Sequence, residues 1–89
     1  MIEPSLLPVL LSLQAVVRSG SVGGAARLLG RTSSAVSQQL RRIEQHFGLK
    51  LFERSGRGIR LTGVGQAALP VVQRFVDEAE ELFRHLSQL

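Results

Sequence analysis

The sequence contains no cysteine, tryptophan or tyrosine, and its aromatic residues are four phenylalanines. A disulfide framework and a cysteine-based metal site are therefore excluded. The absence of cysteine is also compatible with a reducing compartment. With 89 residues, the chain has room for one domain with a small core, because short chains bury a limited fraction of their surface.

Long apolar runs are scarce as well. The Leu6–Val17 segment has the apolar character of a signal-peptide core, but Glu3 precedes it where a positive residue is expected, and no small-residue cleavage site follows. The run is too short and too interrupted to cross a membrane. We therefore interpret it as a core helix and expect no membrane association.

Groups that hold metals or catalyse reactions are equally sparse. His46 and His85 lie far apart in the sequence without spaced ligand partners, so no metal site is expected. No Ser–His–acid arrangement is expected in so small a chain. Gly63–Ala68 (GVGQAA) matches a dinucleotide-binding pattern, but the strand that should follow is not predicted. We expect neither an enzyme nor a cofactor, although a fragment of a nucleotide-dependent enzyme is one alternative.

Positive charge is concentrated in the middle of the chain. The net charge is +4, and Arg27–Arg60 carries eight basic against two acidic residues, a local excess of +6. Residues 61–89 carry two arginines against four acidic residues, a local excess of −2. This distribution predicts that the middle contacts a polyanion and that the tail contacts protein. An ordinary solvated basic surface is the alternative.

Apolar residues at helical spacing predict three short helices in the first 50 residues. These helices are expected at residues 6–18, 22–29 and 33–46. Their expected N-caps are Ser5, Ser21 and Thr32. Gly30-Arg31-Thr32 fits the tight turn of a helix-turn-helix unit.

The helix expected at 33–46 has two different faces. Its apolar stripe should be buried and consists of Val36, Leu40, Ile43 and Phe47. The opposite face carries hydroxyl, amide and guanidinium groups without a carboxylate, and polar groups near such an N-terminus can reach base edges in DNA. The predicted base-reading residues are Ser33, Ser34, Ser37 and Gln38, and Gln38 could pair bidentately with adenine. Arg41 and Arg42 lie deeper in the helix and are expected at phosphates.

A short hairpin is predicted next, with strands at residues 51–54 and 59–62 joined by Ser55–Gly58. Arg54, Arg57 and Arg60 would make this hairpin a basic wing, which we expect to contact the DNA backbone. A hairpin that merely covers the core needs the same apolar residues, so both interpretations remain compatible.

Residues 63–89 read as one long helix capped by Thr62. Its apolar residues alternate at spacings of four and three, which is a heptad seam. The seam consists of Ala68, Val72, Phe75, Ala79, Leu82, Leu86 and Leu89, and a second apolar strip consists of Val64, Val71, Val76 and Phe83. Such a helix must pack on its own domain, on a second copy, or on both. Pro70 predicts a bend or break near Leu69.

The segments GSVGGAARLLGRTSSAVSQQLRRIE and GLKLFERSGRGIRLTGVGQAAL resemble the DNA-binding domain of LysR-type transcriptional regulators. The resemblance covers about residues 6–89. It implies a mainly α fold, with a three-helix winged helix-turn-helix and a two-stranded β wing at residues 1–62, and a long linker and dimerisation helix at 63–89. Family members are bacterial cytoplasmic proteins, usually with a C-terminal effector domain, which we do not expect in this chain.

The resemblance also implies partners and site residues. Double-stranded DNA and a second copy of the chain are the expected partners, a tetramer can form in a full-length protein, and no small-molecule ligand is expected. Base contacts fall at the four residues named above, and the wing approaches the minor groove. The resemblance implies backbone contacts at Arg31, Thr32 and Arg54. The positions of the other arginines on the helix and the wing add expected backbone contacts at Arg41, Arg42, Arg57 and Arg60. A winged-helix protein-interaction module without DNA binding is the other alternative.

Overall fold

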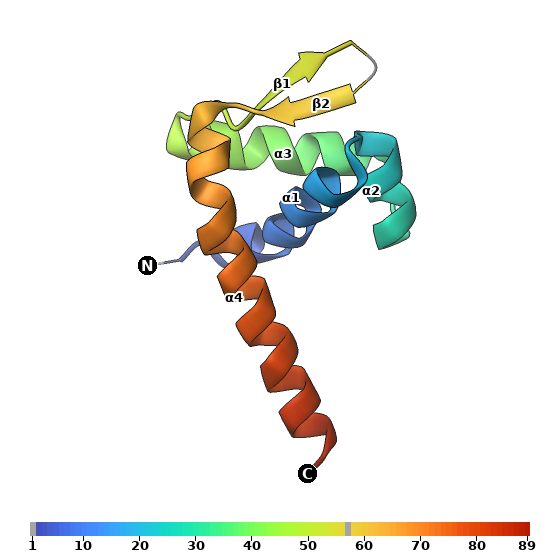
Figure 1. Cartoon of the computed structure of the whole chain (residues 1–89), viewed down its shortest axis with the longest axis vertical. Coiled ribbons are helices and arrows are strands. Elements are labelled where there is room, and N and C mark those ends of the chain that lie inside the picture. Colours follow the sequence, from blue (N-terminus) through green and yellow to red (C-terminus); the bar gives the residue numbers. More distant parts are fainter. Residues whose placement is uncertain (1, 57) are drawn as a thin grey trace.

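The computed structural model describes residues 2–56 and 58–89. Its elements are a 3-10 helix η1 (Pro4–Leu6), helices α1 (Leu7–Ser19), α2 (Val22–Leu29) and α3 (Ser33–Phe47), strands β1 (Phe52–Ser55) and β2 (Gly58–Leu61), and helix α4 (Gly63–Ser87). Figure 1 shows α1, α2 and α3 in one body, the hairpin beside α3, and α4 projecting away from that body. The mainly α winged-helix fold predicted from the sequence is confirmed.

Hydroxyl side chains define three of the four long helix starts. Ser21 Oγ accepts the Gly24 N–H at 2.9 Å, Thr32 Oγ1 accepts the Ala35 N–H at 3.1 Å, and Thr62 Oγ1 accepts the Gly65 N–H at 3.2 Å. Each bond satisfies a backbone donor that the helix itself leaves free. These three predicted caps are confirmed.

The prediction for the first helix start was wrong. Ser5 does not cap α1, which begins at Leu7 without a side-chain cap. Glu3 instead caps η1 by accepting the Ser5 N–H at 2.9 Å. The carboxylate two residues upstream therefore takes the backbone donor, and it adds one 3-10 turn before the α-helix.

The turn between α2 and α3 is as tight as predicted. Gly30 adopts φ +64°, and the Arg31 N–H donates to the Ala26 carbonyl at 2.9 Å. This left-handed conformation is favourable for glycine and costly for a residue with a Cβ atom. Gly30 therefore ends α2 and redirects the chain into α3 within a few residues.

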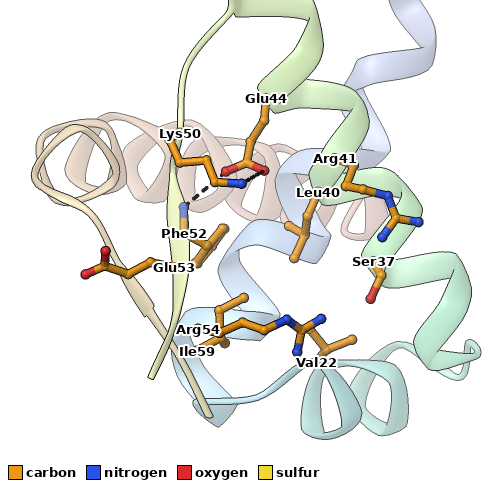
Figure 2. Close-up of a pocket in the computed structure, with 10 residues that line it drawn as sticks. All are labelled: Val22, Ser37, Leu40, Arg41, Glu44, Lys50, Phe52, Glu53, Arg54 and Ile59. Carbon is orange, nitrogen blue, oxygen red and sulfur yellow. Dashed lines mark hydrogen bonds and ion pairs between the residues drawn. The ribbon is translucent and has the colours of Figure 1, made fainter. Parts of the chain in front are cut away.

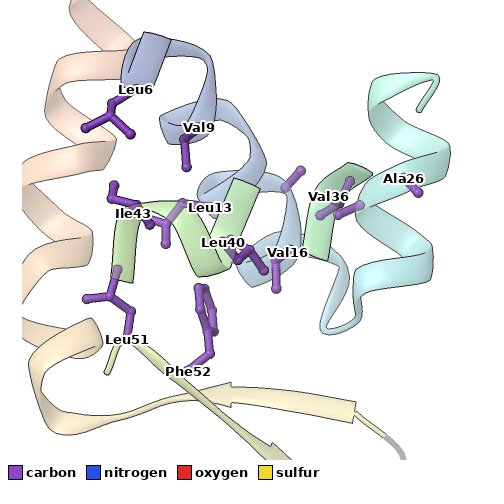
Figure 3. Packing of buried hydrophobic residues seen from close by; sticks show 12 residues of the cluster. Leu6, Val9, Leu13, Val16, Ala26, Val36, Leu40, Ile43, Leu51 and Phe52 are labelled. Carbon is purple, nitrogen blue, oxygen red and sulfur yellow. The ribbon is translucent and has the colours of Figure 1, made fainter. Parts of the chain in front are cut away.

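The core lies between α1, α2, α3 and the first residues of the hairpin (Figure 3). It contains Leu6, Val9, Leu13, Val16, Ala25, Ala26, Val36, Leu40, Ile43, Leu51 and Phe52. Val36 is fully buried, and the predicted inward stripe of α3 is confirmed for three of its four members. Phe47 is the exception at 60% exposure, because α3 ends there and Gly48 turns the chain; its ring packs edge-on against His46.

The hairpin is antiparallel and begins one residue later than predicted. Phe52 pairs with Leu61, Glu53 with Arg60, and Arg54 with Ile59. Because side chains alternate along a strand, Arg54 shares a face with buried Phe52, while Glu53 and Arg60 lie on the other face. The register therefore separates two arginines that the sequence suggested would act together.

Helix α4 continues through Pro70, so of the bend or break predicted near Leu69, the break is wrong. Several contacts hold its first half to the body. Val76 is buried where α4 crosses α1, and Gln14 Nε2 of α1 donates to Gln73 Oε1 at 3.2 Å. At the start of α4, Gly65 approaches Leu51 so closely that a Cβ atom would lie 2.3 Å from the Leu51 carbonyl oxygen.

Candidate nucleic-acid interface

The outer face of α3 is polar and accessible. Ser33, Ser34 and Gln38 are exposed, and Ser37 is half-buried at the edge of the wing. Gln45 and Arg41 extend the same face toward the C-terminus of the helix, and both are exposed. The orientation predicted from the sequence is confirmed, since Val36, Leu40 and Ile43 point inward and the hydroxyl, amide and guanidinium groups point outward.

A cleft of about 400 Å³ separates this helix from the wing (Figure 2). Ser37 and Arg41 line it from α3, and Arg54 lines it from β1. Figure 2 shows the Arg54 side chain extending from the strand toward Val22 and Ser37, whereas Glu53 points away from α3. The cleft thus has one arginine in its lining on each side.

Lys50 is a third cation at this cleft, and its place in the sequence indicated nothing beyond the general positive charge of residues 27–60. Its side chain is exposed, and its Nζ lies 4.0 Å from Glu44 Oε1. Lys50 precedes the hairpin by two residues, so a count of charges on the wing alone overlooks it. Its position outside any predicted element is the reason it was missed.

Other predicted phosphate-contacting arginines lie in different environments. Arg60 forms an ion pair with Glu53 at 2.9 Å on the outer face of the hairpin. Arg42 donates to the Ser5 hydroxyl of η1, which directs it away from the wing. Arg31 and Thr32 are exposed in the turn before α3, and Arg57 lies outside the described residues.

The seam predicted on α4 is largely uncovered. Ala68, Val72 and Ala79 are half-buried, whereas Phe75, Leu82 and Leu86 are exposed. Val71 and Phe83 of the second strip are also exposed, and Val76 is buried. The described residues therefore leave an apolar surface along the projecting helix that the chain does not cover by itself.

The structure offers little support for a dinucleotide-binding site, a metal site or a membrane-spanning helix in the described residues. Gly63–Ala68 forms the first turns of α4, and residues 66–89 contain no strand that could complete a dinucleotide-binding unit. Among the residues that the structure describes, no group of three His, Asp or Glu side chains is placed to hold a metal ion. Nor is any helix in residues 2–56 and 58–89 long and apolar enough to span a membrane.

The arrangement supplies two kinds of recognition group. Hydroxyl and amide groups on α3 can donate to and accept from base edges, and the cations around the cleft can pair with phosphates. A helix-turn-helix with an accessible second helix, followed by a β hairpin beside that helix, defines a winged helix-turn-helix protein.

Comparison with known proteins narrows this class to a family. Residues 8–66 match the family model of the bacterial regulatory helix-turn-helix proteins of the lysR family, and the chain belongs to that family. The HTH-type transcriptional regulator TdcA of Escherichia coli K12 is 38% identical over 78 residues, which cover 88% of this chain and 25% of TdcA. The chain thus spans about a quarter of the length of this relative.

Solved structures agree with the fold. A crystal structure of a complex of the CbnR DNA-binding domain with DNA superposes with a TM-score of 0.80 at 30% identity, covering 91% of this chain and 93% of that one. Oxidised OxyR of Corynebacterium glutamicum superposes with a TM-score of 0.87 at 29% identity, covering 96% of this chain and 27% of OxyR.

Proposed function

We propose that this chain is the DNA-binding domain of a bacterial transcriptional regulator and that it acts in the cytoplasm without catalysing a reaction. The carboxylate-free outer face of α3 is the observation that carries this proposal. It lies beside a cleft whose lining includes Arg41, Lys50 and Arg54 as well as Glu44 and Glu53, a net positive set. The similarity to a domain whose structure was solved with DNA supports it. In this arrangement α3 enters the major groove and the wing lies near the minor groove.

Base readout is assigned to the N-terminal half of α3. Ser33, Ser34, Ser37 and Gln38 lie within its first two turns, where a helix end can reach base edges. Gln38 has the longest reach and two hydrogen-bonding groups, so it discriminates bases most strongly, with adenine as the expected partner. The hydroxyls donate and accept equally well and discriminate less.

Phosphate contacts are assigned to the cations around this helix. Arg41, Arg54 and Lys50 face the cleft, and Arg31 and Thr32 flank the start of α3. Arg60 and Arg42 contribute less, because each already has a partner in the free protein. Arg57 is assigned to the backbone from the sequence alone.

The domain division is proposed as residues 1–62 for DNA binding and 63–89 for dimerisation. Exposed apolar residues of α4 would pack on a second copy, so that two reading helices meet a pseudo-palindromic operator. The dimerisation residues are Ala68, Val72, Phe75, Ala79, Leu82 and Leu86. A full-length protein can assemble further into a tetramer.

Selection of bound sequences from a random duplex pool tests this function directly. The wild-type domain should enrich a pseudo-palindrome, and Gln38→Ala should lose about 1–3 kcal/mol of discrimination at one base pair in each half-site. Gln45→Ala is the matched control, because Gln45 is an exposed amide on the same helix but lies two turns further from its N-terminus.

Two results would reject parts of the proposal. No binding to any duplex at low salt would favour a winged-helix protein-interaction module, because the basic middle should bind DNA even non-specifically. Unchanged preferences in Gln38→Ala would remove base readout from that residue while leaving the domain a DNA-binding one.

A further inference from the structure

Glu44 is the one carboxylate on α3, and its side chain is directed at the backbone of the wing. Its Oε2 accepts the Leu51 N–H at 2.7 Å and the Phe52 N–H at 3.2 Å, as the dashed lines in Figure 2 partly show. The side chain is 13% exposed. A charged acceptor that is shielded from water makes strong hydrogen bonds, because little solvent competes for it.

The main chain of the same residue holds the preceding loop. The Glu44 carbonyl accepts the N–H groups of Gly48 and Leu49. One residue of α3 therefore accepts four backbone N–H groups between the end of α3 and the start of β1. The connection between helix and wing is consequently short and tightly tied, although it contains no regular secondary structure.

The ion pair with Lys50 is too weak to be the main interaction of Glu44. The Lys50 Nζ is 4.0 Å from the carboxylate, and its side chain is 78% exposed, so the pair is weak and screened by solvent. Arg41 and Arg42 are close in sequence, but neither is paired with Glu44 among the ion pairs of the described residues. The main interaction of the Glu44 carboxylate is therefore with the N–H groups of Leu51 and Phe52.

The hydrogen bonds between Glu44 and the amides of Leu51 and Phe52 also affect the position of Arg54. Arg54 lies two residues after Phe52 on the same strand face, and it lines the cleft opposite Arg41. Since β1 starts at the amide that Glu44 holds, the position of Arg54 relative to α3 depends on that carboxylate. Among the hydrogen bonds of the described residues, no other side chain of α3 reaches the segment from Gly48 to Arg54.

We infer that Glu44 is a positioning residue that sets the wing, and Arg54 with it, at a fixed distance from the reading helix. Glu44 does not contact DNA itself, and its effect on binding passes through Arg54. This inference rests on the proposed DNA-binding function, and it adds a residue that fixes the geometry of the site.

The free protein provides a first test that does not involve DNA. In Glu44→Gln the amides of Leu51 and Phe52 lose a charged acceptor, so their hydrogen exchange should accelerate at least about tenfold. The Ala35 amide, which Thr32 holds, is the internal control and should keep its rate. Unchanged exchange at Leu51 and Phe52 would overturn the inference whether or not the domain binds DNA.

The second test is a double-mutant cycle on the salt dependence of DNA binding. In the wild-type domain, Arg54→Ala should lower the slope of log K against log salt by about one unit, the value for one lost phosphate contact. In the Glu44→Gln background the same Arg54→Ala change should lower the slope by clearly less than it does in the wild-type domain, because the amides keep only a neutral acceptor. Arg31→Ala is the control, and it should lower the slope equally in both backgrounds, because Arg31 precedes α3 and is not held by Glu44.

Each outcome has a distinct meaning. If Arg54→Ala has equal effects in both backgrounds while Arg31→Ala behaves as expected, the positioning role is rejected and DNA binding stands. If the wild-type domain does not bind duplex DNA, the proposed function fails. The exchange measurement alone then tests whether Glu44 holds the amides of Leu51 and Phe52. Glu44→Asp retains the charge on a shorter side chain, which can reach at most one of the two amides. In this background Arg54→Ala should lower the salt-dependence slope by part of the wild-type amount. Lowering by the full wild-type amount would indicate that Glu44 acts through its charge alone.

Discussion

Helices α3 and α4 are both amphipathic, but only α3 buries its apolar stripe within this chain. Val36, Leu40 and Ile43 are in the core, whereas Phe75, Leu82 and Leu86 of α4 are exposed. The side chain of Leu82 is 52% exposed, although its place in the apolar stripe of α4 corresponds to that of the buried residues in the stripe of α3. Similar sequence patterns therefore end in different environments.

This difference in burial suggests that the apolar stripe of α3 stabilises the folded domain, whereas that of α4 is available for association with another chain. A stripe that packs against three other elements contributes to the stability of the domain, because each buried side chain adds apolar contact. The exposed outer residues of the α4 stripe contribute little to the stability of the domain until another surface covers them. We expect mutations in α3 to act on the folded state and mutations in the outer half of α4 to act on association.

Val36→Asp should have the largest effect. The side chain is fully buried, and a carboxylate at this site would have no partner, so the loss should exceed about 4 kcal/mol and leave the domain unfolded. Circular dichroism with thermal denaturation measures this loss. Gln45→Asp places the same group on the exposed face of α3 and should change the stability by less than about 0.5 kcal/mol. A folded Val36→Asp domain would contradict the core assignment.

Leu82→Asp should abolish association without unfolding the domain. A charge in an apolar seam would have to be desolvated when two copies meet, and nothing in the single chain buries this residue. Light scattering should therefore report a dimer for the wild type at tens of micromolar and a monomer for the variant, with unchanged helical content. Glu81→Gln, beside the seam, should remain a dimer. A monomeric wild type would reject the assignment of α4 to dimerisation.

Thr32→Ala should cost about 1 kcal/mol of stability. The substitution removes the acceptor for the Ala35 N–H at the start of the reading helix, while the core stays intact. Urea denaturation measures the change, and Thr32→Ser, which retains the hydroxyl, is the control. A loss as large as that of Val36→Asp would show that the cap does more than close one hydrogen bond.

Arg60→Ala should have the smallest effect on stability, below about 0.5 kcal/mol. The ion pair with Glu53 is solvent-exposed on both sides, and exposed pairs of this kind contribute little. The same denaturation experiment at low and high salt checks this value. A loss above about 1 kcal/mol would indicate that the pair fixes the hairpin.

Local chemistry accounts for what the sequence could predict. Ser21, Thr32 and Thr62 lie immediately before apolar periodic segments, so the starts of α2, α3 and α4 were readable from adjacent residues. The inward stripe of α3 was equally clear for Val36, Leu40 and Ile43. The wing could be placed, because glycines mark its turn.

Longer-range features could not be predicted in the same way. The separation of Arg54 from Arg60 depends on the strand register, and a one-residue shift moves every side chain to the other face. The exposure of Phe47 follows from the path of the chain after Gly48. In the sequence Glu44 only lies off the polar face of α3, and its role is visible only once the amides of Leu51 and Phe52 are placed beside it.

Helix α4 is fixed to the body at its start, where Gly65 packs on the Leu51 carbonyl, and again at buried Val76. The segment from residue 77 to the end of α4 at Ser87 therefore projects freely for about 16 Å at the usual rise. A change of about 10° in the direction of this segment would displace its end by about 3 Å, which is close to one base-pair step of about 3.4 Å. A larger residue at position 65 would alter which operator spacings a two-fold assembly can span, without changing any group that meets a base.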